Sequence, residues 1–420
     1  MPHAELFLIL ACLFGFFMAW GVGANDVANA MGTSVGSKAL TIRQAIFIAI
    51  VFEALGATLA GGQVTNTIRS HIIDVSAFEH SKSLFVFGML SALLAAGTWL
   101  MTATYFSWPV STTHTIVGAV VGFGFVAAGV HAVHWSSLIN IVLSWIVTPL
   151  ISGLIAYLLF RSVQELIFDS DRPVQRARYC IPVYIFLVFM VLSLVTLLSG
   201  LKQLNVHFSA WHSIGLSFLI SLAASFVGVL LLNRMNFGSK DDASKGVNFH
   251  KLERVFSILM IFTACAMAFA HGSNDVANAI GPLAAVVDVV HQLPLSKPGH
   301  IPLWVMMLGA LGIILGLSTY GYRVIATIGD NITQLTPSRG FAAQLATAST
   351  VVIASGIGLP ISTTQTLVGA VFGVGLARGM GALNLSVVGN IFVSWVITVP
   401  AGALLAILYY FLLKWLFHVL

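Results

Sequence analysis

Long apolar stretches separated by short polar connections dominate the hydrophobicity pattern of this chain. A helix needs roughly 20 mostly apolar residues to cross the hydrocarbon core of a bilayer. Twelve stretches approach that length, some of them short or interrupted by Gly and Pro: 4–22, 41–60, 83–106, 110–129, 136–160, 180–200, 210–232, 252–271, 302–320, 340–358, 361–377 and 386–413. The pattern predicts an all-α polytopic membrane protein with about 12 transmembrane helices.

Two further segments, 26–38 and 275–290, are shorter and only moderately apolar. We interpret them as re-entrant segments or half-helices rather than as additional crossings. Irregular backbone survives at membrane depth only where protein surrounds it or where it lines a cavity. Broken helices at these two places would therefore mark the interior of the protein.

The composition agrees with a membrane protein and excludes a soluble one. The chain of 420 residues is 58% hydrophobic and 8% charged, with a mean hydropathy of +0.97, whereas soluble domains carry about 25% charged residues. The three cysteines show no paired spacing, which argues against a disulfide framework or a zinc site. The net charge of +5 is explained by membrane topology and predicts no nucleic-acid partner.

The distribution of lysine and arginine predicts the orientation. With the N-terminus outside and alternating crossings, 14 of the 19 cations fall on the cytoplasmic side, as the positive-inside rule requires. The cations placed outside are Arg69, Lys82, Lys202, Lys297 and Lys414. Segment 4–22 starts with His3 and Glu5 nearby instead of Lys or Arg, so we do not interpret it as a cleaved signal peptide. We expect a multi-pass protein of the cell membrane with both termini outside.

A polar motif occurs twice inside this apolar pattern. Residues 23–32 read Gly-Ala-Asn-Asp-Val-Ala-Asn-Ala-Met-Gly, and residues 272–281 are identical at 8 of 10 positions. A charged side chain at the bilayer centre costs about 2.5–3.5 kcal/mol even on a lenient scale, so an intramembrane acid indicates function. Carboxylate and amide oxygens suit a monovalent cation, and the motifs supply them from Asn25, Asp26, Asn29, Asn274, Asp275 and Asn278. Glu53 lies in another apolar run near Gly56, and we group this acid with the cation ligands.

A second motif, Pro-x-Ser-Thr-Thr, is also duplicated. Residues 109–124 match residues 360–375 at 11 of 16 positions. Proline, serine and threonine favour helix starts, so each copy should open a half-helix whose free N–H groups and positive dipole end bind an anion. The added hydroxyl donors are Ser111, Thr112, Thr113, Ser362, Thr363 and Thr364. His114 becomes Gln365 in the second copy, which favours a hydrogen-bonding role over a symmetric metal ligand.

Neither anion motif contains lysine or arginine. Neutral donors would bind a multivalent anion well only when co-transported cations are present, which is a physical basis for coupling.

The duplicated motifs predict the domain organisation. A third pair, 140–145 and 390–395, keeps the same order at an offset close to 250 residues. We therefore expect repeats at residues 1–160 and 252–420, joined by two transmembrane helices and cytoplasmic loops in residues 161–251. Seven crossings separate equivalent points, so the repeats should be inverted. Inverted repeats with broken helices are a common plan for secondary transporters.

Both motif pairs resemble those of the inorganic phosphate transporter (PiT) family. The resemblance covers both halves of the chain and includes His271-Gly-Ser-Asn-Asp-Val-Ala-Asn-Ala-Ile-Gly-Pro. It implies a 12-helix symporter that takes up phosphate with sodium or protons. It also implies that the two motif types form the phosphate and cation sites, with Asn29 and Asn278 joining the Ser-Thr-Thr residues around phosphate.

The chain departs from this family pattern in its second half. Glu53 matches a family acid, and the counterpart acid of the family lies in Gly-Phe-x-x-Glu-Leu, where residues 340–345 here carry Gln344 instead. We place Gln344 among the cation-coupling positions and expect one cation fewer, or one held more weakly. The choice between Na⁺ and H⁺ stays open.

Other functions fit the sequence less well. Another tetrahedral oxyanion such as sulfate is the nearest alternative substrate, and an anion channel would not need duplicated buried acids. We found no nucleophile beside a base and no metal cluster, so an enzyme is not expected. We expect no cofactor; the expected partners are inorganic phosphate, Na⁺ or H⁺ and the lipid bilayer, with a homodimer left open.

Overall fold

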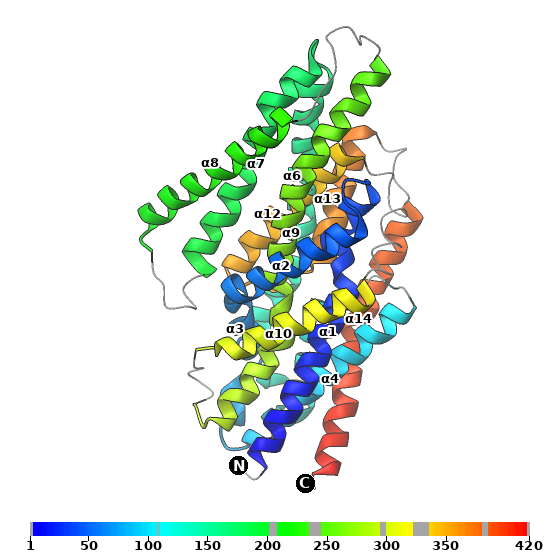
Figure 1. The fold of residues 1–420 in the computed structure, drawn as a ribbon. Helices are drawn as coiled ribbons and strands as arrows, with labels where there is room; N and C mark the ends of the chain where they lie inside the picture. Colours follow the sequence, from blue (N-terminus) through cyan, green and yellow to red (C-terminus); the bar gives the residue numbers. More distant parts are fainter. Residues whose placement is uncertain are drawn as a thin grey trace.

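The computed structural model describes residues 3–106, 108, 110–200, 208–234, 245–294, 300–321, 336–379 and 385–417. Within these residues the regular structure is helical, apart from one isolated antiparallel bridge between Ile73 and Val133. The chain forms an elongated helical bundle with its two termini at the same end (Figure 1). Of the outer-side lysines expected above, Lys202 and Lys297 lie outside the described residues.

The α-helices are α1 (Ala4–Gly36), α2 (Ile42–Ala60), α3 (Gly62–Ser70), α4 (Lys82–Tyr105), α5 (Thr112–Ala128), α6 (Trp135–Val163), α7 (Pro173–Val195), α8 (Ala210–Arg234), α9 (Lys245–Val290), α10 (Leu303–Gly316), α12 (Pro337–Gly356), α13 (Thr363–Arg378) and α14 (Leu385–Leu416). Short 3₁₀ turns occupy Val75–Phe78 and Val130–Ala132, and π-helical turns occupy Gln164–Phe168, Thr196–Gly200 and Leu317–Gly321.

In the described part of the chain, nine helices are long and apolar enough to cross a membrane. They coincide with nine of the twelve runs expected from the sequence, so the polytopic class is confirmed. The three remaining runs became α5, α12 and α13. Helices α5 and α13 have only 17 and 16 residues, about 25 Å at 1.5 Å per residue, and α12 carries many buried polar side chains.

The segments after the two Asn-Asp motifs are not re-entrant, which corrects the expectation for 26–38 and 275–290. Both motifs lie within continuous helices, α1 of 33 residues and α9 of 46 residues. Asn and Asp weaken helices when their side chains bond to their own backbone. Here the amide groups of Asn25 and Asn274 bond to other helices, so they do not compete with the helical ladder.

The Ser-Thr-Thr motifs do open helices, as expected. Ser111 caps α5 and Ser362 caps α13, and each hydroxyl oxygen accepts a hydrogen bond from the backbone N–H three residues later, at 3.2 Å in both cases. Each short helix follows a longer one, so α4–α5 and α12–α13 form two helical hairpins. Pro109, expected at the first hairpin tip, lies outside the described residues.

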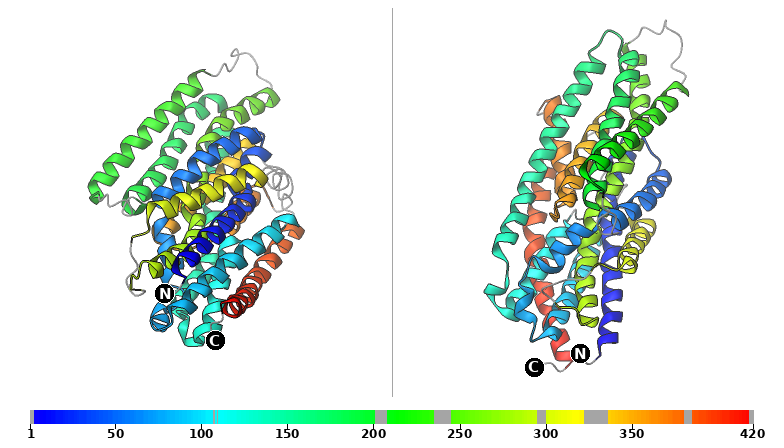
Figure 2. Two further views of the ribbon diagram at one scale, coloured as in Figure 1. Left: turned by 60° about the horizontal axis from the view of Figure 1, so that its bottom comes forward. Right: turned by 90° about the vertical axis from the view of Figure 1, so that its left-hand side faces the viewer.

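Helices from the first half of the chain pack mainly against helices from the second half. Helix α2 packs along α9 and α10 along α1, while α13 packs along α6 and α5 along α14. Glycines permit this close approach: a Cβ on Gly272 would lie 2.2 Å from the Glu53 carbonyl oxygen, and a Cβ on Gly23 would lie 2.0 Å from that of Ile313. Helices α7 and α8 pack against each other at one edge of the bundle (Figure 2).

Arg69 is not a solvated loop cation. It lies on α3, is 2% exposed, and forms an ion pair with Asp288 of α9, which is 4% exposed. A neighbouring α3 hydroxyl, that of Thr67, donates to the carbonyl of Gly358 at 2.6 Å. Since buried charges are costly unless paired, the ion pair holds α3 against α9. The Thr67 hydrogen bond places α3 beside the tip of the α12–α13 hairpin.

Candidate functional site

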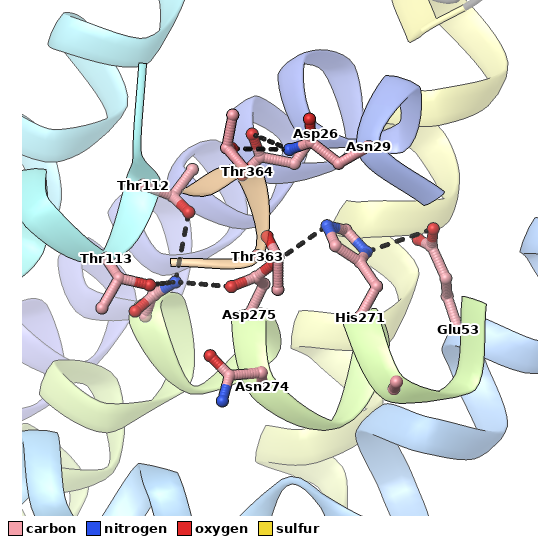
Figure 3. A network of polar contacts seen from close by, with 12 residues as sticks. Asp26, Asn29, Glu53, Thr112, Thr113, His271, Asn274, Asp275, Thr363 and Thr364 are labelled. Carbon is pink, nitrogen blue, oxygen red and sulfur yellow. Dashed lines mark hydrogen bonds and ion pairs between the residues drawn. The ribbon is translucent and has the colours of Figure 1, made fainter. Parts of the chain in front are cut away.

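The site lies where the Asn-Asp motifs of α1 and α9 meet the starts of α5 and α13 (Figure 3). The two Asn-Asp motifs and the two Ser-Thr-Thr elements contribute twelve side chains, and each is at most 5% exposed. Polar groups this deeply buried need partners inside the protein. The hydrogen bonds show which of the expected residues the fold brings together.

The first asparagine of each motif holds a helical hairpin. The Asn25 side-chain amide donates to the Thr104 hydroxyl on α4 at 2.7 Å. The Asn274 amide donates to the Ser355 hydroxyl on α12 at 3.0 Å and to the Leu359 carbonyl at 3.3 Å. The Asn274 side-chain oxygen is buried and has no hydrogen-bond partner, so it is free to bind a cation.

The second asparagine of each motif crosses to the other part of the chain. The Asn29 amide donates to the Thr364 hydroxyl at 2.7 Å and to the Asp26 carboxylate at 3.3 Å. The Asn278 amide lies within 3.4 Å of hydroxyl oxygens on Thr112 and Thr113 and of the Asp275 carboxylate. Each Asn-Asp motif therefore contacts the Ser-Thr-Thr element that comes from the opposite end of the sequence.

His271 is a site residue that the sequence reasoning missed. Its Nε2 lies 2.9 Å from the Asp275 carboxylate, and its Nδ1 lies 3.2 Å from the Glu53 carboxylate on α2. The signal was available, because residues four apart share a helix face and His271 precedes Asp275 by four. The equivalent position in the first motif is Val22, so the two halves of the site differ.

The acids converge on one point. The ligand atoms of Asp26, His271 and Asp275 all lie within 4.8 Å of one another, and Oδ2 of Asp26 is buried without a hydrogen-bond partner. Several buried carboxylates in one network need compensating positive charge. The arrangement is therefore suited to a cation with oxygen ligands or to protons. The sequence showed no such cluster, because Asp26 is about 250 residues away from His271 and Asp275 along the chain.

Donors that an anion could use come mainly from the helix starts. The first N–H groups of α5 and α13 have no intrahelical partner. The two helix starts, with their positive dipole ends, lie close together, because the Thr113 hydroxyl bonds to the Ile361 carbonyl. Several hydroxyls are already engaged: Thr113 donates to the Ile361 carbonyl at 2.9 Å, and Thr363 donates to the Asp275 carboxylate at 2.8 Å. An anion that binds these two hydroxyls must replace those partners. The backbone N–H groups of His114 and Gln365 already donate to the serine caps, so the N–H groups ahead of them in each first turn are the ones that an anion could use.

Gln344 lies in a separate network and does not face Glu53. Its carbonyl oxygen accepts from the Thr263 hydroxyl at 3.0 Å, and its amide donates to the Ala30 carbonyl at 3.0 Å and the Ser34 hydroxyl at 2.8 Å. The position in the other half of the fold that is equivalent to Glu53 is Ile313. The Glu53 carbonyl packs against Gly272 of the second Asn-Asp motif, and the Ile313 carbonyl packs in the same way against Gly23 of the first. The pairing of Glu53 with Gln344 is a sequence correspondence that the fold does not reproduce.

Comparison with known proteins finds relatives that match most of this chain. The model of the phosphate transporter family matches residues 22–406. A putative phosphate permease of Haemophilus influenzae is 52% identical over 413 residues, covering 97% of each chain. The chloroplastic inorganic phosphate transporter 2-1 of Arabidopsis thaliana is 43% identical over 426 residues, covering 96% of this chain and 71% of the relative.

A solved structure described as the sodium-dependent phosphate transporter has the same fold. Its TM-score is 0.91 at 40% sequence identity, and the match covers 98% of this chain and 99% of the other. Because the family model matches residues 22–406 and the Haemophilus permease and the solved structure match almost end to end, the chain belongs to the phosphate transporter family.

Proposed function

We propose that this protein is a symporter that carries inorganic phosphate across the cell membrane together with Na⁺ or H⁺. The observation that carries the proposal is the meeting of two helix starts with two Asn-Asp motifs in one buried site. Helix starts supply donors for an oxyanion, and carboxylates supply ligands for cations. The two substrates would thus bind side by side.

The same geometry explains coupling. The site pairs neutral hydrogen-bond donors with three buried carboxylates, from Asp26, Glu53 and Asp275. An anion brought next to these carboxylates is repelled unless cations or protons neutralise them. Phosphate and its co-substrate would therefore raise each other's affinity, and this reciprocity is what a symporter needs.

The architecture we propose is a pair of inverted repeats with both termini outside and about 12 crossings in total. Two observations support it: α5 and α13 begin with the same serine cap, and equivalent helices exchange packing partners between the two ends of the chain. The termini at one end of the bundle agree with an even number of crossings.

Sodium is the co-substrate that we favour. The structural relative is described as sodium-dependent, and the unpartnered oxygens of Asp26 and Asn274 suit a bare cation. The Glu53–His271–Asp275 contacts provide the alternative, because a histidine between two carboxylates can hold a proton.

Uptake of labelled phosphate into proteoliposomes tests the function. We expect saturable uptake driven by an inward sodium gradient, with arsenate competing and sulfate not competing. Uptake driven only by a proton gradient would assign the other co-substrate. Uptake indifferent to both gradients would indicate a channel, and competition by sulfate as strong as that by phosphate would overturn the substrate assignment.

Gln344→Glu is expected to strengthen the sodium dependence of uptake. The Gln344 amide now donates to two oxygens, Ala30 O and Ser34 Oγ, and an ionised glutamate has no donor for either. A cation among these oxygens and the new carboxylate would satisfy all of them. Uptake measured against sodium concentration should show half-activation at lower sodium or a steeper curve.

The matched control for this prediction is Gln344→Met, which removes the same hydrogen bonds without adding charge. It should lower thermal stability and leave the shape of the sodium curve unchanged. Identical sodium curves for Gln344→Glu and the unmodified protein would contradict the prediction.

A further inference from the structure

Trp145 belongs to the third duplicated motif, residues 140–145 and 390–395, and it lies beside the site. It is on α6, the helix that packs along α13, and is 8% exposed. Its indole N–H donates to the carbonyl of Pro360 at 3.2 Å. That carbonyl is in the tip of the α12–α13 hairpin, two residues before the Ser362 cap of α13.

The ring of Trp145 contacts the other hairpin. Its centroid lies 3.9 Å from the centroid of the His114 ring, and the ring planes are tilted by 35°. His114 is in the first turn of α5 and directly follows Thr113. One indole thus contacts the tips of both hairpins, the second through its N–H and the first through its ring face.

A hydrogen bond also joins the same two hairpin tips directly, without Trp145. The Thr113 hydroxyl donates to the carbonyl of Ile361, the residue after Pro360, at 2.9 Å. The starts of α5 and α13 are therefore connected at two points, by Thr113 itself and by Trp145 from α6. These are the helix starts that supply N–H donors to an oxyanion.

We propose that Trp145 is a positioning residue that sets the separation between the two anion-binding helix starts, and so sets phosphate affinity and the selectivity for anion size. This proposal rests on the proposed function. Hydrogen bonds weaken steeply as distance and angle depart from the optimum, and binding groups must be held to within about 0.5 Å. Two donors on different helices reach opposite sides of one small oxyanion only if their separation is fixed.

Trp145→Phe tests the proposal, because it removes the N–H donor and keeps an aromatic ring beside His114. We expect the half-saturating phosphate concentration to rise about two- to tenfold, the effect of losing one hydrogen bond of about 0.5–1.5 kcal/mol. Maximal uptake and the sodium dependence should change little. Inhibition by the larger anion arsenate should weaken less than phosphate binding. Without the Trp145 hydrogen bond, the separation between the two helix starts is no longer held at the value that fits phosphate.

Trp135→Phe is the matched control. Trp135 is on the same helix, and its indole N–H also donates to a backbone carbonyl, that of Val130 at 3.1 Å, but the side chain is 49% exposed. The same substitution there should leave the phosphate half-saturation unchanged.

Several results separate the proposal from its alternatives. A lower yield of folded Trp145→Phe protein with unchanged half-saturation would show a purely structural role and overturn it. Equal weakening of phosphate and arsenate would overturn the selectivity part. Phosphate binding to the purified protein in detergent is measured in parallel. If the unmodified protein neither binds nor takes up phosphate, the proposed function has failed. If the unmodified protein takes up phosphate and Trp145→Phe has the same half-saturating phosphate concentration, only the positioning role is refuted.

Discussion

Replacement of Asp26 or Asp275 by asparagine is expected to abolish coupled phosphate uptake while leaving the protein folded. Both carboxylates are at most 1% exposed, and their oxygens lie within 4.8 Å of each other and of a His271 ring nitrogen. Asparagine keeps the volume and removes the charge that a cation or proton requires. Each interaction with a charged group contributes about 1.5–3 kcal/mol. A variant that loses two such interactions of its carboxylate should therefore reduce uptake by about a hundredfold or more.

Sodium-driven uptake of labelled phosphate measures this effect, and the thermal transition in detergent checks the folded state. Asp74→Asn is the control: Asp74 lies in the connection before α4, where hydrogen bonds from Ser76 hold the pKa of its carboxyl below the usual value, so its charge is present at neutral pH. Removing that distant charge should leave uptake unchanged. Normal uptake by Asp26→Asn or Asp275→Asn would remove that residue from the coupling site.

Removal of a hydroxyl from either helix start should weaken phosphate binding about ten- to hundredfold. Thr112→Val and Thr363→Val keep the shape of the side chain and delete one group that can bond to the anion. A hydrogen bond to a charged group contributes about 1.5–3 kcal/mol, which gives this range. The readout is the phosphate concentration for half-maximal uptake, measured at saturating sodium.

The two valine variants should differ in their sodium dependence. Thr363 now donates to the Asp275 carboxylate at 2.8 Å, so its loss should also alter sodium activation, whereas Thr112 accepts from the Asn278 amide at 3.4 Å. Thr115→Val is the control, because this α5 hydroxyl donates to the Ser111 carbonyl in its own helix at 2.9 Å. If half-saturation is unchanged in both Thr112→Val and Thr363→Val, the helix starts do not bind phosphate through these hydroxyls.

Local chemistry made several features predictable from the sequence. Apolar run length indicated a polytopic helical protein, because a segment in lipid must satisfy its own backbone. The starts of α5 and α13 were predictable because a serine cap acts within three residues of itself. The Asn-Asp motifs were identifiable as candidate site residues because they are polar, duplicated and surrounded by apolar sequence.

Only the tertiary structure decided which residues far apart in the sequence contact each other. The Asn-Asp segments looked like helix breaks, but they stay helical because Asn25 and Asn274 find partners on α4 and α12. The bridging role of His271 depends on α2 lying against α9. Arg69 looked like a loop cation, and only the packing of α3 on α9 gave it Asp288 as a partner.

Glu53 and Gln344 show the same limit. A motif correspondence paired them, but helix packing puts Glu53 opposite Gly272 and puts Gln344 among Ala30, Ser34 and Thr263. Sequence determines which residues are polar, apolar or able to cap a helix, because those properties belong to the residue and its close neighbours. Which polar groups meet inside the bundle is set by how glycine-lined helices from the two ends of the chain pack, and that depends on contacts hundreds of residues apart.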